Sequence, residues 1–197
     1  VHDNRAILLW SPDGKKIATF QQDQRKTSTM TLVATNVGAP KAEQWKYPFV
    51  GDENVTMIER VVIDLSAAKP QTIRLQMPPD QHRSTCSDDV ACSNGWEDVQ
   101  WGADGKTLAF VSTDRGHKSA TLHVADAQTG SVRTVFEETV ATQYQSAPAL
   151  GSVNWRYLPE SNEFLWFSQK SDWGHLYLHD LTTGKLKRQI TSGDWNV

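Results

Sequence analysis

Three copies of a pattern that joins an aromatic residue, a turn and an apolar strand constrain the fold of this chain more than any other feature. The clearest copies read Trp-Ser-Pro-Asp-Gly at residues 10–14 and Trp-Gly-Ala-Asp-Gly at residues 101–105, and an apolar segment follows each. A looser copy starts at Trp155 and ends in the aromatic segment 164–167. A recurring pattern of this kind indicates repeated units of one supersecondary structure.

A second signature recurs in step with the first. An aspartate follows an apolar segment at Asp64, Asp126 and Asp180, and Thr-Gly follows the last two. Trp101 and Trp155 are 54 residues apart, and the same 54 residues separate Asp126 from Asp180. Because two independent signatures keep one interval, the chain is expected to contain a structural repeat.

The residue types of each unit predict antiparallel strands joined by tight turns. Glycine reaches positive φ without steric cost, so the Asp-Gly pairs favour such turns. Segments 17–20 and 108–111 are rich in residues that suit a pleated surface, and 122–124 alternates apolar with polar residues. Each unit thus has the size and form of a four-stranded propeller blade.

The sequence therefore predicts an all-β chain of consecutive four-stranded antiparallel blades that forms part of a β-propeller. The chain has no initiating methionine and starts almost directly on a strand, so we expect it to be a segment of a longer protein. It is expected to form a single partial domain. Its expected parts are a blade at 1–78 with an insertion at about 21–58, a blade at 96–138, a blade at 150–191 and the start of the next blade at 193–197.

The insertion is located by comparing intervals. Trp10 and Asp64 are 54 residues apart, whereas Trp101 and Asp126 are only 25 apart, so about 29 residues are added before the third strand of the first unit. The added segment contains a candidate strand at 29–33.

Composition excludes some function classes. A chain of 197 residues with 38% apolar and 22% charged residues can bury a sizeable core. The net charge of −3 argues against a nucleic-acid partner. No apolar run is long enough to span a bilayer.

Several motifs occur in a fixed order along the chain. They are residues 7–14, Tyr-Pro-x-x-Gly-x-x-Asn at 47–54, Val-Val-Ile-Asp at 61–64, His-Leu-Tyr at 175–177 and Ile-Thr-x-Gly-x-Trp-x-Val at 190–197. Together they resemble the N-terminal β-propeller of dipeptidyl peptidase IV-like serine peptidases of the prolyl oligopeptidase family. In that family an eight-bladed propeller lies over an α/β-hydrolase domain, and the two remove dipeptides with proline or alanine in second place. The resemblance implies that this chain supplies just over three blades.

The resemblance implies that this chain is a non-catalytic segment of such an exopeptidase, which walls the active-site chamber and gates substrate entry. No Gly-x-Ser-x-Gly nucleophile elbow occurs in the sequence, so we expect the chain alone to be inactive, with no cofactor or metal. The implied partners are a C-terminal α/β-hydrolase domain and peptide substrates, in a periplasmic or secreted parent protein. The alternative is a non-enzymatic protein-interaction propeller of the scaffold or assembly type.

Two segments are candidates for contacts with substrate. The family binds the substrate's α-amino group with adjacent glutamates, but the position of that pair relative to Trp10 falls at or before Val1. Glu137 and Glu138 are therefore interpreted as a solvated, charged strand edge rather than as that pair. Residues 154–156, which are Asn154, Trp155 and Arg156, could line the chamber or could pack in the core.

Cys86 and Cys92 lie six residues apart in a polar segment. They could form a small disulfide loop, remain free thiols or bind a metal with His82, although the usual Cys-x-x-Cys spacing is absent. The resemblance to an exported peptidase favours the disulfide.

The tryptophans also lead to expectations about packing and association. Trp10, Trp101 and Trp166 lie in apolar segments and are expected to pack between blades. A run of about three blades leaves the first and last without a neighbour, so the chain is expected to self-associate. In the family the insertion tends to take part in subunit contacts.

Overall fold

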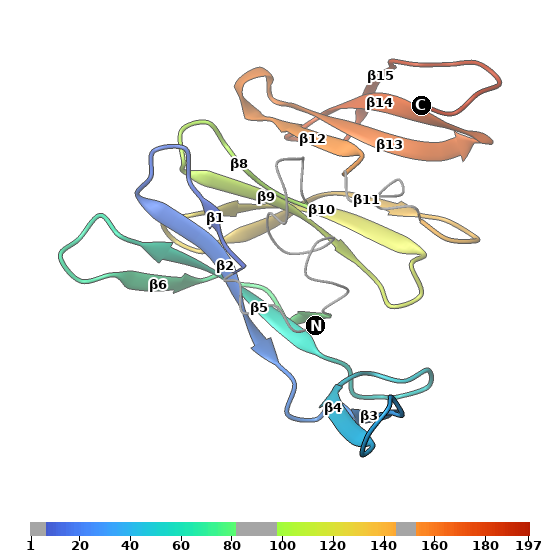
Figure 1. Ribbon diagram of the computed structural model, residues 1–197. Coiled ribbons are helices and arrows are strands. Elements are labelled where there is room, and N and C mark those ends of the chain that lie inside the picture. The colour runs from blue at the N-terminus through green and yellow to red at the C-terminus, as the bar shows by residue number, and fades with distance from the viewer. Residues whose placement is uncertain (1–6, 82–97, 145–152) are drawn as a thin grey trace.

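The computed structural model describes residues 7–81, 98–144 and 153–197, and within these ranges the chain is all-β. Figure 1 shows three twisted sheets side by side, in the order in which they occur along the chain. Each sheet contains four antiparallel strands that follow one another in space, apart from a short fifth strand in the first. The prediction of consecutive four-stranded antiparallel blades is confirmed.

The strands of each blade are as follows. The first blade contains β1 (Leu9–Trp10), β2 (Lys16–Asp23), β5 (Met57–Asp64), β6 (Gln71–Arg74) and the short β7 (Asp80–Gln81). The second contains β8 (Val99–Trp101), β9 (Thr107–Thr113), β10 (Ser119–Asp126) and β11 (Val132–Thr139). The third contains β12 (Trp155–Leu158), the 3-10 turn Pro159–Ser161, β13 (Glu163–Ser171), β14 (Trp173–Asp180) and β15 (Leu186–Gln189).

The second sequence signature forms the turn after the third strand of each blade. In the second blade Oδ1 of Asp126 accepts hydrogen bonds from the backbone N–H groups of Gln128 and Thr129, at 2.8 and 2.7 Å. These two N–H groups hold the pKa of the Asp126 carboxyl below its usual value. Gly130 completes the turn at φ +76°, a conformation that favours glycine. The Thr-Gly repeat therefore has a local cause in the turn.

The core lies in the two seams, a term used here for the interfaces between neighbouring blades. Between the first and second blades it includes the buried side chains of Val62, Leu108 and Phe110. Between the second and third blades it is more aromatic, and Phe136 meets Trp166 edge-on with ring centroids 5.3 Å apart. Because the second blade lies between the other two, its strand β9 is buried over most of its length, whereas the outer strand β11 is mostly exposed or half-buried.

The expected packing of the tryptophans is only partly correct. Trp166 is fully buried between blades, and Trp101 packs against the first seam and donates its Nε1–H to the Leu9 carbonyl at 3.2 Å. Trp10 is 52% exposed, so its expected burial between blades is wrong. Trp10 has the same place in the first blade as Trp101 in the second, and the described residues contain no blade on that side of it.

The pairing of strands revises the alignment of the third repeat. Trp101 pairs with Leu108, and the corresponding pair in the third blade is Tyr157 with Phe164. Tyr157, rather than Trp155, is thus the counterpart of Trp101. The first connection has the same length in both blades, because Trp101 and Leu108 are as far apart in sequence as Tyr157 and Phe164. The sequence intervals hid the shift because the turn between β13 and β14 is shorter than the turn between β9 and β10.

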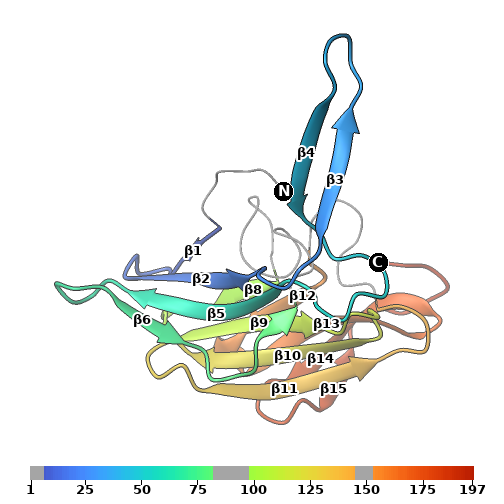
Figure 2. The same cartoon turned by 90° about the horizontal axis from the view of Figure 1, so that it is seen from below.

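The insertion forms a separate two-stranded hairpin, β3 (Thr29–Ala34) with β4 (Lys41–Lys46), between β2 and β5. We call this hairpin the arm. Figure 2 shows it standing away from the blades. Its base is braced, because the buried hydroxyls of Thr27 and Thr56 lie 3.1 Å apart and Lys46 Nζ donates to the Thr27 carbonyl at 2.9 Å.

Candidate functional site

Residues 154–156 enter the innermost strand of the third blade, where their side chains have different surroundings. Trp155 is 1% exposed, and its Nε1–H donates to Oδ1 of the equally buried Asp98 at 2.8 Å. Trp155 therefore packs in the second seam. Asn154 and Arg156 are partly exposed on either side of it. A role for these three residues in lining a substrate chamber remains a prediction.

Gln100 joins the inner strands of the second and third blades through its side-chain amide. Its Oε1 accepts the backbone N–H of Tyr157 at 2.9 Å, and its Nε2 donates to the Trp155 carbonyl at 3.2 Å. A side-chain amide here replaces a strand partner and satisfies two backbone groups at once. Position 156 is therefore held rigidly by the backbone on both sides. No sequence signal identified Gln100, because a single polar residue in a short strand is not distinctive.

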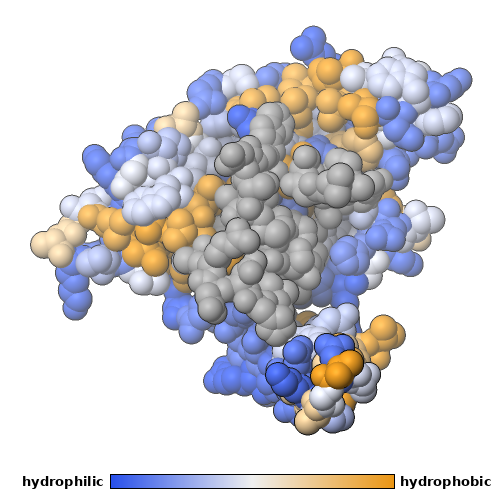
Figure 3. Space-filling model, viewed as in Figure 1, coloured by the Kyte–Doolittle hydropathy of each residue, from blue (hydrophilic) through white to orange (hydrophobic). Residues whose placement is uncertain are grey.

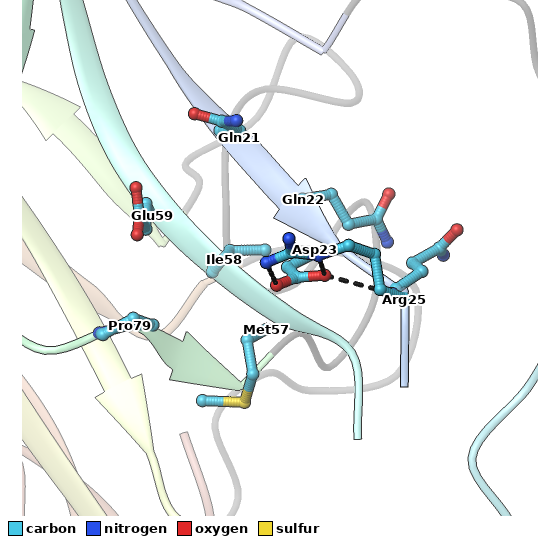
Figure 4. A pocket seen from close by; sticks show the side chains of 9 residues that line it. Gln21, Gln22, Asp23, Arg25, Met57, Ile58, Glu59 and Pro79 are labelled. Carbon is cyan, nitrogen blue, oxygen red and sulfur yellow. Dashed lines mark hydrogen bonds and ion pairs between the residues drawn. The ribbon is translucent and has the colours of Figure 1, made fainter. Parts of the chain in front are cut away.

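A pocket of about 560 Å³ lies at the end of the first blade near the start of the arm. Its lining includes residues 21–25, 57–59 and Pro79, and Figure 4 shows the side chains from β2 and β5 around it. Asp23 and Arg25 form an exposed ion pair at 2.6 Å, and the hydrogen bonds from Arg25 lower the pKa of Asp23 to about 2. Arg74 pairs with Glu59, the other acidic residue of the lining, at 2.6 Å.

The pocket lining is partly polar and partly apolar, and its carboxylates already have cationic partners, so it offers no nucleophile with an adjacent base. The imidazoles of the third blade are engaged elsewhere. His175 contacts the Thr191 hydroxyl at 3.2 Å and the Gly193 carbonyl at 2.9 Å, while Nδ1 of His179 contacts the Gly184 carbonyl at 2.9 Å. Ser171 contacts the Tyr177 hydroxyl at 2.9 Å. These contacts connect turns and strands, and they do not form a Ser-His-Asp arrangement.

Glu137 and Glu138 point to different surroundings, and this changes their interpretation. Glu137 is exposed and accepts a hydrogen bond from Ser119 Oγ at 2.9 Å within its own blade. Glu138 is half-buried and accepts hydrogen bonds from Trp166 Nε1 at 2.6 Å and from Ser168 Oγ at 2.5 Å, both in the next blade. Glu138 is thus not a solvated strand edge. The strand pattern missed this because the contact depends on a residue 28 positions further along the chain.

Three further expectations concern metals, membranes and cysteines. Among residues 7–81, 98–144 and 153–197, no group of three His, Cys, Asp or Glu side chains is placed to hold a metal ion. The same ranges contain no helix with the length and apolar character needed to cross a membrane. Cys86 and Cys92 lie outside the described residues, so their expected disulfide remains a prediction.

On the face of the molecule drawn in Figure 3, exposed apolar surface occurs in a few places. Figure 3 shows it over β1 and β2, over the third blade and on the arm. Leu32 and Val33 of the arm are 54% and 56% exposed, although both lie within a strand. An arrangement of this kind is suited to contacts with other protein surfaces.

Solved structures with the same arrangement of blades come from dipeptidyl peptidases. The chain superimposes with a TM-score of 0.70 on a protein assigned as dipeptidyl aminopeptidase IV from Bacteroides ovatus ATCC 8483, with 19% identity, covering 95% of this chain and 27% of that one. It superimposes with a TM-score of 0.67 on dipeptidyl peptidase 4 from Porphyromonas gingivalis, with 18% identity, covering 96% of this chain and 24% of that one. At these identities the structures establish the fold.

The chain spans about a quarter of the length of these two proteins. The family described as the dipeptidyl peptidase IV N-terminal region matches residues 1–197. Since this match extends over the whole sequence and the blades agree with it, the chain belongs to the dipeptidyl peptidase IV N-terminal region family.

Proposed function

We propose that this chain is part of the propeller of a dipeptidyl peptidase IV-like serine exopeptidase. In this role it walls the active-site chamber and admits only unstructured peptide N-termini. The parent protein removes Xaa-Pro and Xaa-Ala dipeptides, and a C-terminal α/β-hydrolase domain supplies the nucleophile. The observation that carries the proposal is the family match over residues 1–197.

The geometry of the chain supports a wall rather than a catalyst. His123, His175 and His179 contact threonine hydroxyls or backbone carbonyls, and the pocket carboxylates are paired with arginines. The seams are packed with buried aromatic rings, and Gln100 ties the inner strands together. A rigid wall of this kind can exclude folded chains from a chamber while leaving the chemistry to another domain.

The test compares the whole parent protein with the 197-residue chain. The whole protein should hydrolyse Gly-Pro and Ala-Pro p-nitroanilides, and the chain alone should not. An N-acetylated Gly-Pro anilide is the control, because an enzyme that needs the free α-amine should leave it intact. Turnover by the chain alone that survives repurification would contradict the division of roles. A whole protein that hydrolyses neither free substrate would support the interaction-propeller alternative.

We also propose that the parent protein is periplasmic or secreted. An exported peptidase is the setting in which Cys86 and Cys92 would form a stable disulfide. Cell fractionation of the source organism should place the peptidase activity outside the cytoplasm. Recovery of the activity only in the cytoplasmic fraction would contradict this proposal.

A second proposal concerns the arm, which we infer contacts another subunit. An isolated two-stranded hairpin is marginally stable in water, yet the arm exposes Leu32 and Val33. Its orientation is fixed from the second blade, because Arg115 donates to the backbone carbonyls of Phe49 and Asp52 at the base of the arm. A braced hairpin with exposed apolar side chains is suited to a subunit interface.

The arm proposal predicts a change in oligomeric state. Replacing Leu32 and Val33 by serine should lower the subunit number of the parent protein in light scattering, with Thr31→Ser as the control on the same strand. An unchanged oligomer would exclude the arm as the interface.

A further inference from the structure

Two carboxylates occupy equivalent positions on the outer strands of the first two blades. Asp80 pairs with Ile58, and Glu138 pairs with Ala120. Ile58 and Ala120 each lie six residues before the aspartate that ends the third strand of their blade. The equivalence is not visible in the sequence, because Pro78 and Pro79 interrupt the outer strand of the first blade and leave Asp80 on the separate strand β7.

Each carboxylate reaches across a seam to a serine of the next blade. Asp80 accepts a hydrogen bond from the Ser112 hydroxyl through Oδ2, and Glu138 accepts one from the Ser168 hydroxyl through Oε1 at 2.5 Å. The two serines are also equivalent, since each lies two residues beyond a fully buried aromatic ring on the second strand of its blade. The same carboxylate-to-serine contact is therefore repeated at both seams.

Each carboxylate also has a second donor. Arg60 donates from Nη1 to Oδ2 of Asp80 at 2.9 Å, and its side chain is only 4% exposed. Trp166 donates from Nε1 to Oε2 of Glu138 at 2.6 Å. Hydrogen bonds to an ionised acceptor are stronger than neutral ones, so each site is a charge-assisted contact between blades.

Both contacts lie where the outer strand ends and the chain goes on to the next blade. Gln81, the last residue of β7, donates from Nε2 to the Thr113 carbonyl of the second blade at 2.9 Å. After β11, the ring of Tyr144 packs against Trp166 of the third blade with centroids 5.7 Å apart. The described parts of both connections are thus tied to the following blade close to the carboxylate.

We propose that Asp80 and Glu138 are seam locks, positioning residues that fix each blade to the next at the end from which the connecting segment departs. The inference rests on the contacts at the two seams and does not depend on the proposed peptidase activity. On β2, the second strand of the first blade, the position equivalent to Ser112 is occupied by Gln21. Its side-chain oxygen accepts a hydrogen bond from Arg74 of the same blade. The hydrogen bond from a serine to a carboxylate of the preceding blade therefore occurs at the two seams for which the described residues include both blades.

The chemistry of the two locks predicts the effect of neutral variants. Glu138 uses one oxygen for each donor, whereas glutamine has only one acceptor oxygen. In Glu138→Gln the side-chain NH2 group, which can only donate, must therefore face either the indole N–H, which is also a donor, or the Ser168 hydroxyl, which must then turn to accept. In Asp80→Asn the buried Arg60 loses its anionic partner. Each variant should weaken its own seam.

The test is hydrogen exchange of the full chain, followed by mass spectrometry. Glu138→Gln should speed exchange in β11, β12 and β13 roughly tenfold or more and leave β2, β5 and β6 unchanged. Asp80→Asn should speed exchange in β5, β6 and β9 and leave β14 and β15 unchanged. Glu137→Gln and Glu59→Gln are the matched controls, because these exposed carboxylates lie next to the same strand positions.

Serine variants keep the test decisive if a carboxylate variant fails to fold. Ser112→Ala and Ser168→Ala leave both charges in place and should each speed exchange only at their own seam. A double-mutant cycle of urea midpoints should show coupling between Glu138 and Ser168 and none between Glu138 and Ser112. Exchange in the lock variants that matches the controls, or that rises equally in all three blades, would overturn the proposal.

Discussion

Gly184 is expected to be essential for the packing of the third blade against the second. Its φ is +71°, and a Cβ at this position would lie well inside van der Waals contact of the Val135 carbonyl in the preceding blade. Gly130 has the same relation to the Arg74 carbonyl, 54 residues earlier in the chain. A methyl group at Gly184 therefore has two costs. It strains the left-handed backbone conformation, and it overlaps the Val135 carbonyl across the seam.

Gly14 separates these two costs. It has a similar φ of +67°, but a Cβ there would meet nothing within 4 Å. Gly14→Ala should therefore cost only the left-handed backbone penalty, about 1 kcal/mol in the free energy of unfolding. Gly184→Ala adds the overlap with a backbone carbonyl, about 2 kcal/mol more, for a total of about 3 kcal/mol.

Urea unfolding followed by tryptophan fluorescence measures this difference, since Trp155 and Trp166 lie in the affected seam. With a slope of about 2 kcal/mol per molar urea, Gly184→Ala should lower the midpoint by roughly 1.5 M and Gly14→Ala by roughly 0.5 M. Equal shifts for the two variants would refute the assignment of Gly184 to the seam.

Three further predictions concern pH, oxidation and association. Burial lowers the pKa of His123 and of His179 below 6.5, so the unfolded chain binds protons that the folded chain does not. Their contribution to the free energy of unfolding should be complete above pH 6.5 and decline as the pH falls below it. Replacing both by asparagine should make the urea midpoint fall less steeply with decreasing pH. An unchanged pH dependence of the midpoint would count against this explanation. If Cys86 and Cys92 are bonded, alkylation under denaturing, non-reducing conditions should leave both unmodified, and labelling of both would exclude the bond. The unmutated 197-residue chain should self-associate in light scattering, and Trp10→Arg should shift it toward monomer. A strictly monomeric unmutated chain would contradict this.

The blades could be predicted from the sequence because their signals are local. The Asp-Gly pairs and the Thr-Gly signature require particular backbone angles within a few residues, and Gly14, Gly105 and Gly130 have those positive φ angles. The same reasoning predicts the insertion, since a constant interval elsewhere shows where residues are added. Signals of this kind need no knowledge of the neighbouring blade.

The interior of the seams could not be predicted in the same way, because one position has different chemistry in successive blades. Phe110 of the second blade corresponds to Trp166 of the third, while the first blade has Thr19 there. Thr19 instead donates its hydroxyl to the Ile7 carbonyl. A sequence repeat marks these positions as strand, but it does not say what fills them.

The two seams differ in the residue that the preceding blade places against the buried aromatic ring of the next blade. Arg60 lies over the Phe110 ring at 4.5 Å in the first seam, whereas the equivalent residue at the second seam is the buried Leu122. A buried guanidinium needs an anionic partner, and Asp80 supplies it. With leucine in that place the carboxylate of Glu138 is free to take the indole N–H of Trp166 instead. The carboxylate and the serine therefore stay constant while the second donor changes with the residue that covers the ring.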